Sequence, residues 1–287
     1  MIAKMGYPAL AMVHAENIDI VLRLREKLEK EGRQDGQVWN ESRPNYVEAE
    51  CMHRAIFLAK VAECPLFIVH NTIGEAPEIL AKAKAEGVDL KAEICPQYLT
   101  HNSEEPAPVL LENPTFAVVN PPLRGKCDNE MLWKGIKDGV IDTVGSDNAP
   151  ATREQKGWDM WNSYMGTGSN TQMILPVMLS EGVNKNRVSL ERVVEVCCQN
   201  PAKIFGLYHK KGVIRIGSDA DLVIVDMDKK VKFANEMSAG LGGWTIYKDW
   251  EFTGWPVLTM LRGKVIMEDG KIVAELEYGR YISRGQK

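Results

Sequence analysis

The sequence has no uninterrupted apolar run long enough to cross a bilayer and no block of basic residues. A transmembrane helix needs about 20 apolar residues, and proteins that bind nucleic acid usually carry a clustered positive surface. The formal net charge is −4 at pH 7. We therefore expect no membrane and no nucleic acid as a partner. The apolar N-terminus lacks a basic region followed by a small-residue cleavage site, so we expect no signal peptide.

Cys-x-x-Cys pairs are also absent. The 6 cysteines are scattered through 287 residues without a regular framework. Small secreted domains space their cysteines for disulfides, whereas scattered cysteines in a chain of this size are typical of reduced, mostly buried thiols. We therefore predict a cytoplasmic protein with free thiols. Internal repeats and low-complexity segments are absent as well.

Short apolar runs alternate with helical patterns through about the first two thirds of the chain. Strands that alternate with helices predict parallel β/α units and a sheet that is covered on both faces. The strand-like runs are 9–14, 64–70, 90–96, 115–120 and 140–147. The helical patterns are 45–63, 75–87, 129–139 and 189–207, the last of which continues past Pro201.

The pattern changes near Lys210, where short alternating strands and turn residues begin. The run 257–273 is typical of a β-hairpin closed by Asp269-Gly270, because this dipeptide favours a tight two-residue turn. The sequence therefore predicts an α/β unit over 1–208 and a small all-β unit over 209–287.

Three residues with metal-ligand chemistry end separate strand-like runs: His14, His70 and Asp147. In a parallel α/β barrel the carboxyl ends of the strands meet at one mouth. Two imidazoles and a carboxylate there suit zinc or a similar divalent ion, which would activate a water and polarise a carbonyl. The carboxylate could then move the proton to a leaving nitrogen. A strand-end histidine is often structural, and the spacing alone leaves both interpretations open.

Several motifs, in their order along the chain, resemble those of the cyclic amidohydrolases. The hydantoinases and dihydropyrimidinases are the most similar branch, and allantoinases and dihydroorotases are less similar. The resemblance covers essentially the whole chain. Its motifs are VHAEN (13–17), IVHNT (68–72), CPQYL (95–99), NPPLR (120–124), GSDNAP (145–150), the run 200–226, the run 254–273 and GRYISRG (279–285).

The resemblance implies a (β/α)8 TIM-type barrel with a β-sandwich, of which this chain holds the later strands and a C-terminal sandwich segment. It implies a site with two divalent metals, zinc being our first choice, bridged by a carboxylated lysine and a hydroxide. His14, His70 and Asp147 match three of the metal ligands, and Asp147 also matches the proton shuttle. The implied reaction is ring opening of a small cyclic amide or ureide by a metal-bound hydroxide.

The resemblance also suggests substrate contacts. Asn120 precedes a Pro-Pro pair where the family holds the cyclic amide through main-chain groups. Asn170 lies in the loop 166–172, which resembles the second substrate loop but equally fits a flexible connector. Arg124 could bind a substrate carboxylate, although we favour a salt bridge that anchors its loop.

The sequence departs from the family pattern because it contains no His-x-His pair. Lys4 is the one lysine before His14, and it is too close to His14 to be the bridging lysine. A fragment, a shortened gene product and a half-protein completed by another chain all fit this pattern. Open sheet edges should then favour a homo-oligomer or completion by another polypeptide. Two alternative functions stay open: a non-catalytic assembly or scaffold protein, and an allantoinase or dihydroorotase specificity.

Overall fold

Four short strands form a parallel sheet in the order β1-β2-β3-β4. The computed structural model describes residues 1–168 and 170–285, and of Asn170 the backbone alone. Among these residues β1 and β4 are the end strands, so each leaves one edge without a strand partner. The strands are β1 (Ala11–Val13), β2 (Leu66–Ile68), β3 (Leu90–Ile94) and β4 (Thr143–Val144).

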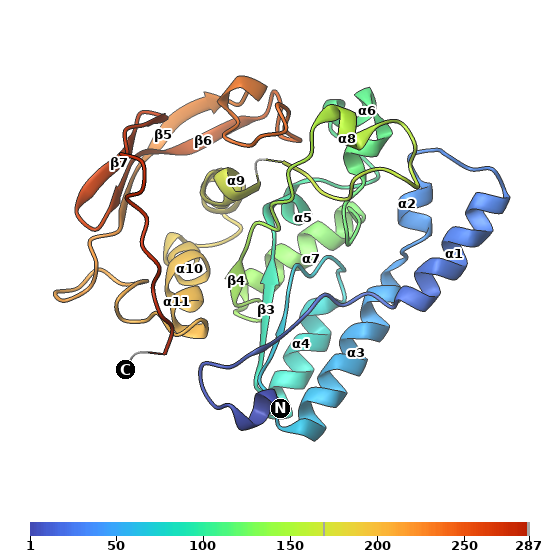
Figure 1. Ribbon diagram of the computed structural model, residues 1–287, viewed down its shortest axis with the longest axis horizontal. Coiled ribbons are helices and arrows are strands. Elements are labelled where there is room, and N and C mark those ends of the chain that lie inside the picture. Colours follow the sequence, from blue (N-terminus) through green and yellow to red (C-terminus); the bar gives the residue numbers. More distant parts are fainter. Residues whose placement is uncertain (169, 286–287) are drawn as a thin grey trace.

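Helices cover both faces of this sheet (Figure 1). On one face lie α3 (Asn45–Ala62), α4 (Ala76–Ala85) and α7 (Lys126–Lys137). On the other face a helical series separates the parallel sheet from a second sheet. That series comprises α9 (Asn170–Val177), η3 (Met178–Val183), α10 (Leu190–Val194), η4 (Glu195–Gln199) and α11 (Asn200–Ile204). The predicted β/α alternation with a buried parallel sheet is therefore confirmed.

The helical run 189–207 passes through Pro201, as predicted. Ser189 caps its start by accepting a hydrogen bond from the Arg192 N–H. Proline has no N–H and its ring crowds the carbonyl four residues earlier. The turn before it, η4, is a π-helix, and such a wider turn is the usual local adjustment of a helix under strain.

The second sheet is antiparallel, in the order β5-β6-β7-β8. Its last two strands form a hairpin at the predicted turn: Glu268 pairs with Lys271 across Asp269-Gly270, whose φ angles are 44° and 78°. The run 257–273 is not a single hairpin, because a turn at Arg262-Gly263 separates β6 from β7 within it. The domain boundary at residue 208 stays a prediction, and one apolar core extends across it, from Tyr98 and Trp133 to Trp244 and Phe252. The strands are β5 (Leu222–Lys232), β6 (Glu251–Leu261), β7 (Lys264–Glu268) and β8 (Lys271–Ile272).

Two further expectations were wrong. The run 115–120 is not a strand, because Asn113 accepts a hydrogen bond from the Thr115 N–H and Pro114 favours a helical start, which gives the 3-10 helix η2 (Pro114–Ala117). The thiols are not mostly buried: all six are free, but only Cys95 is buried.

Among the described residues no helix is long and apolar enough to span a membrane. The remaining helical segments are η1 (Ile2–Lys4), α1 (Ile18–Lys30), α2 (Val38–Glu41), α5 (Pro96–Thr100), α6 (Pro108–Glu112), α8 (Arg153–Lys156) and η5 (Asn235–Met237).

Candidate active site

Two of the predicted ligands meet at the carboxyl edge of the parallel sheet. Val13 of β1 pairs with Ile68 of β2, so the two strands end side by side. His14 follows β1 directly and His70 comes two residues after β2. The Nδ1 of His14 lies 3.0 Å from the Nε2 of His70, and the rings meet edge to face at 70°. The parallel register thus brings together two imidazoles that are 56 residues apart in the chain.

Glu16 joins this pair. Its Oε2 lies 2.9 Å from the Nε2 of His14, and its side chain is only 5% exposed. A carboxylate only accepts, so His14 donates through Nε2–H and its Nδ1 accepts from the Nε2–H of His70. The Nδ1 of His70 is then a buried acceptor without a hydrogen-bond partner in the described chain. Glu16 fixes which nitrogen of His14 carries the hydrogen, and through it the orientation of both rings.

Asp147 lies three residues beyond β4, in a left-handed backbone conformation with φ 45°. Burial raises the pKa of its carboxyl, and His14 opposes that rise only when its ring is protonated. Because β4 runs parallel to the other strands of the sheet, its carboxyl end, which Asp147 follows, lies at the same edge as the ends of β1 and β2. A carboxyl with a raised pKa near an imidazole pair is suited to take up and return a proton.

Glu93, on β3, is a further carboxylate at this edge. Its backbone carbonyl accepts hydrogen bonds from the N–H and the Nδ2 of Asn71, each at 2.8 Å. A Cβ at Gly145 would lie 2.2 Å from its Oε2, so the carboxylate packs directly on the chain before Asp147. Burial and the charge of Asp147 raise the pKa of Glu93 to about 7, and the His70 N–H opposes that rise. Glu93 therefore connects the ends of β2 and β4.

The histidine pair fits a divalent cation as two ligands. Zinc holds imidazole nitrogens at about 2.0–2.1 Å, which separates two ligating nitrogens in a tetrahedron by about 3.4 Å. The observed 3.0 Å is the length of the hydrogen bond between these two nitrogens, so the His70 hydrogen would have to move to Nδ1 before both could bind a metal. Within the described part of the chain, however, no three His, Cys, Asp or Glu side chains form a group that could hold a metal ion. The structure thus brings His14 and His70 together and does not add Asp147 as a third ligand.

The two predicted substrate residues lie on separate segments. Asn120 follows η2, and its Nδ2 lies 2.8 Å from the sulfur of Met165. Its Oδ1 is buried and has no hydrogen-bond partner in the described chain. Asn170 begins α9, and its side chain lies outside the described residues. The role of both as substrate contacts stays a prediction.

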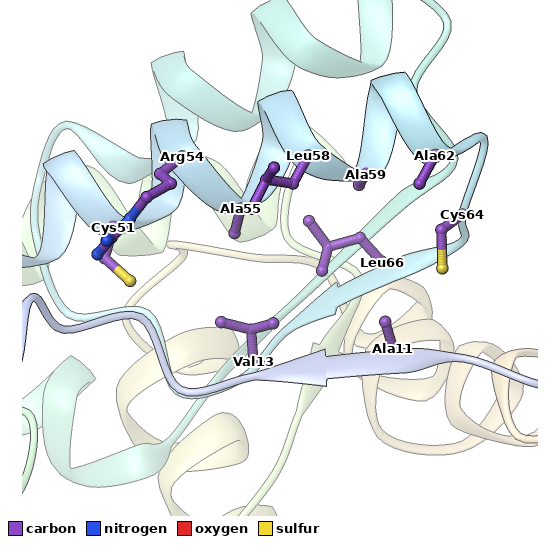
Figure 2. Close-up of a pocket in the computed structure, with 10 residues that line it drawn as sticks. All are labelled: Ala11, Val13, Cys51, Arg54, Ala55, Leu58, Ala59, Ala62, Cys64 and Leu66. Carbon is purple, nitrogen blue, oxygen red and sulfur yellow. The ribbon is translucent and has the colours of Figure 1, made fainter. Parts of the chain in front are cut away.

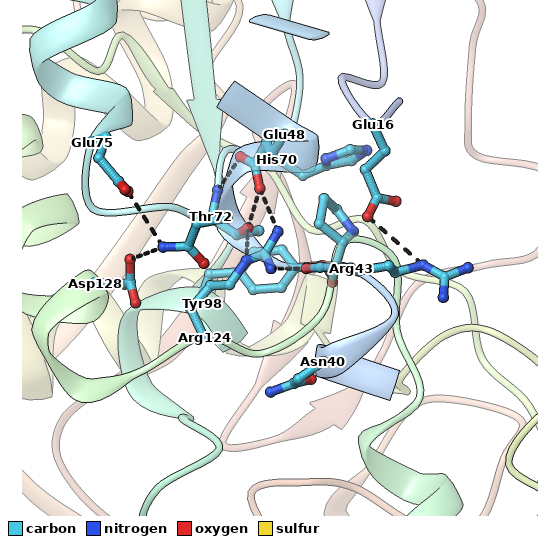
Figure 3. A network of polar contacts seen from close by, with 12 residues as sticks. Glu16, Asn40, Arg43, Glu48, His70, Thr72, Glu75, Tyr98, Arg124 and Asp128 are labelled. Atoms are coloured by element: carbon cyan, nitrogen blue, oxygen red, sulfur yellow. Dashed lines mark hydrogen bonds and ion pairs between the residues drawn. The ribbon is translucent and has the colours of Figure 1, made fainter. Parts of the chain in front are cut away.

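Arg124 anchors its loop, as we favoured, through a buried ion pair with Glu48 of α3 (Figure 3). Its Nη2 lies 3.0 Å from Oε2 of Glu48, and its Nε donates to Oγ1 of Thr72 at 2.9 Å. Arg124 also donates to the carbonyl of Arg43, and Thr72 donates its backbone N–H to Glu48 at 2.8 Å. Each of the three guanidinium nitrogens thus donates a hydrogen bond, and together these bonds fix the segment after His70.

A further pocket lies between α3 and the strands β1 and β2 (Figure 2). Its volume is about 450 Å³. Ala11, Val13 and Leu66 line it from the sheet, and Leu58 and Ala62 line it from the helix. Cys51, Arg54 and Cys64 are its polar or sulfur-bearing residues, and neither His14 nor His70 lines it, so the pocket is not part of the candidate site.

The sequence matches the amidohydrolase family over residues 50–266, which include His70, Glu93 and Asp147. The chain belongs to the amidohydrolase family. The chain is 38% identical over 280 residues to the L-hydantoinase of Paenarthrobacter aurescens, which covers 96% of this chain and 60% of the relative. It is 34% identical over 273 residues to the allantoinase of Solibacter usitatus, with 95% of this chain and 58% of the relative covered.

A solved structure of a similar protein has the same fold over the matched region. The L-hydantoinase (dihydropyrimidinase) of Arthrobacter aurescens superimposes with a TM-score of 0.91 at 37% identity, covering 96% of this chain and 61% of that one. This amidohydrolase chain thus spans about 60% of the length of the curated relatives it matches.

Two residues of the candidate site, Glu16 and Glu93, were not predicted from the sequence. Glu16 had a usable signal, since it stands two residues after His14 in the same strand-end cluster. Glu93 lies within the strand-like run 90–96, at a position that alternation leaves half-buried. Its position beside the His70 backbone depends on the register between β2 and β3, which cannot be read from the sequence.

Proposed function

We propose that this chain takes part in metal-dependent hydrolysis of a cyclic amide, the ring opening of a hydantoin or dihydropyrimidine. The observation that carries the proposal is the 3.0 Å approach of His14 and His70 at the carboxyl edge of a parallel sheet in an amidohydrolase. The names of the relatives, L-hydantoinase and allantoinase, support a cyclic amide or ureide as the substrate class. Because the chain spans about 60% of their length, the activity of the whole relatives is proposed here.

We infer that the parallel sheet is part of a (β/α)8 TIM-type barrel and that the antiparallel sheet is part of a β-sandwich. The β/α alternation and the free edges of β1 and β4 among the described strands support this inference. A homo-oligomer or a further polypeptide would cover those edges. The six free thiols agree with a reducing cytoplasmic compartment, which we likewise propose.

His14 and His70 would hold the divalent metal, for which zinc is our first choice because two imidazoles suit it. When bound, such a metal acts as a Lewis acid and lowers the pKa of water. Glu16 keeps the His14 ring in one orientation through its 2.9 Å hydrogen bond. Asp147 takes the proton released from the attacking water and returns it to the ring nitrogen that leaves.

We propose that the segments of Asn120 and Asn170 bind the substrate. The free, buried Oδ1 of Asn120 supports a role in accepting a ring N–H. Hydrogen bonds to the N–H and C=O groups along the edge of a cyclic amide would fix the ring so that its reacting carbonyl faces the histidine pair.

A non-catalytic assembly or scaffold protein is the second candidate. The observation that favours it is the lack of a third metal ligand beside the histidine pair in the described residues. An allantoinase or dihydroorotase specificity is a variant of the first proposal, supported by the allantoinase relative.

Metal analysis and a substrate panel separate these functions. The purified chain should bind about one zinc or manganese ion per chain, and H14A or H70A should abolish that binding. The matched control is H53A, because His53 lies on the exposed face of α3. Turnover of hydantoin, dihydrouracil, allantoin or dihydroorotate then identifies the ring. A well-folded protein that binds no metal and turns over none of the four would support the scaffold function and overturn the hydrolase.

A further inference from the structure

A fully buried lysine lies where the two proposed substrate segments meet. Lys156 ends α8 and is 0% exposed. Its Nζ donates to three backbone carbonyls: Val118 at 2.9 Å, Tyr164 at 2.8 Å and Gly166 at 3.1 Å. We call these three carbonyls the cage of Lys156. Burial alone lowers the pKa of Lys156, to about 7, so no charged side chain in the described residues offsets its desolvation.

The three carbonyls belong to the segments that carry the predicted substrate residues. Val118 comes two residues before Asn120, and Gly166 begins the loop that leads into Asn170. The Gly166 N–H also donates to the Val118 carbonyl at 3.0 Å, so the segments are joined by the backbone as well. Outside this cage, the Asn120 side chain reaches the sulfur of Met165.

The same loop packs against the chain that follows Asp147. A Cβ at Gly166, whose φ is 152°, would lie 2.4 Å from the carbonyl oxygen of Ala149. The lysine therefore ties together the Asn120 segment and the Asn170 loop at a place where the loop also contacts the Asp147 segment. A displacement of the loop would be transmitted to the Asn120 segment through these hydrogen bonds.

We propose that Lys156 is a positioning residue that sets the distance between the Asn120 segment and the Asn170 loop, and thereby the affinity for the cyclic amide. The proposal rests on the proposed function, because it takes those two segments as the substrate site. Burying a lysine without a counter-charge costs free energy, and three hydrogen-bond acceptors at good distances offset part of that cost. Without the lysine, three buried carbonyls would lose a donor and the segments would separate to reach water.

Amide hydrogen exchange of K156M tests the positioning directly. Methionine has a similar length but donates no hydrogen bond. The Gly166 amide should exchange at least about tenfold faster, since its bond to Val118 depends on the cage, while the amides of β2 and β3 keep their wild-type rates. The control is K84M, because Lys84 of α4 also donates to a backbone carbonyl, that of Val140, and its further ion pair with Asp142 lies outside the two substrate segments. Unchanged exchange at Gly166, or faster exchange over the whole chain, would overturn the proposal.

Steady-state kinetics with hydantoin or another turned-over ring test the consequence for binding. K156M should raise KM about tenfold and change kcat less than about threefold, because a disordered site lowers substrate affinity while His14, His70 and Asp147 are untouched. An unchanged KM, or an equal loss in kcat, contradicts the proposal. Partial recovery of KM in K156Q, whose amide still donates, would support it.

Failure of the two proposals can be told apart. If the wild-type chain turns over no cyclic amide, the proposed function fails, and hydrogen exchange alone decides whether Lys156 joins the segments. If K156M does not fold, the same measurements are made on K156Q and compared with the wild-type protein. In the wild type the Lys156 ammonium protons should exchange slowly enough to be observed by NMR at pH 6, and rapid averaging with solvent would contradict the cage.

Discussion

Glu48 and Arg124 form an ion pair whose side chains are 2% and 4% exposed. Burial raises the pKa of Glu48, and the charge of Arg124 lowers it, so the pair depends on its mutual contact. Removing one partner of such a pair leaves an uncompensated buried charge and costs about 3–5 kcal/mol. We expect E48Q to lower the free energy of unfolding by that amount, as measured by urea denaturation.

The control for E48Q is the same substitution at an exposed pair, E26Q. Glu26 contacts Lys30 within α1, and both side chains are more than half exposed. Water and salt screen such a pair, so its loss should leave the urea midpoint unchanged. Equal midpoints for E48Q and the wild type would show that the buried pair contributes nothing.

The contact of Gly145 with Glu93 leads to a second prediction. A methyl group at this position would overlap the Glu93 carboxylate, so G145A should destabilise the chain by about 1–3 kcal/mol, the usual cost of overpacking. In an E93A background the same change should cost little, because the overlapping atoms are gone. The double-mutant cycle measures this coupling, and G279A is the control because a Cβ at Gly279 meets nothing within 4 Å. Additive effects would mean that the two residues do not touch.

The residue types of the candidate site could be read from the sequence, but their distances could not. His14 and His70 were predicted as partners because each ends an apolar run, and parallel strands end at one edge. Their direct 3.0 Å contact depends on a register in which Val13 faces Ile68. The roles of Glu16 and Glu93 depend on side-chain directions that alternation alone does not specify.

At the scale of elements, α5 is joined to the chain before β6 by His101. Its Nε2 donates to the carbonyl of Ile246 at 2.9 Å, and its ring stacks on Trp250 at 26°. Burial lowers the pKa of His101 to about 4, and the bond to Ile246 opposes this shift. The folded protein therefore keeps His101 neutral where an unfolded chain would bind a proton.

This shift predicts a loss of stability in mild acid. Between pH 6.5 and about 4 the unfolded state binds more protons than the folded state, so the free energy of unfolding falls as the pH falls, by up to about 3 kcal/mol. Replacing His101 by glutamine, which can still donate to Ile246, should remove that part of the pH dependence. Urea unfolding at a series of pH values measures it, with H53Q as the control. Parallel pH profiles for H101Q and the wild type would refute the assignment.

Elements with strong local signals were predicted well. The helices 45–63 and 75–87 and the hairpin at Asp269-Gly270 have periodicity or turn residues that decide their structure locally. The run 115–120 was mistaken for a strand because its apolar residues are buried, and burial does not distinguish a strand from a packed loop. The helix α1, which carries an Asn17 cap, was not predicted at all.

At the scale of the whole molecule, the apolar groove between α3 and β1 is open to solvent. Leu58 and Phe57 on α3 are 58% and 65% exposed, and β1 has no partner on its outer edge in the described chain. A sheet edge and an apolar groove side by side favour pairing with another polypeptide. This is the physical basis for expecting either a homo-oligomer or completion by a further segment.

Sedimentation velocity over a range of concentrations tests that expectation. The wild-type chain alone should sediment as a species heavier than one chain, with a fraction that grows with concentration. L58E places a charge in the groove and should shift the equilibrium towards the single chain by at least about tenfold in the dissociation constant, because an unpaired charge would be buried. L276E introduces the same charge at a side chain that is 95% exposed and far along the sequence from the groove, so it should sediment like the wild type. A single-chain species at every concentration for all three proteins would exclude self-association through this groove.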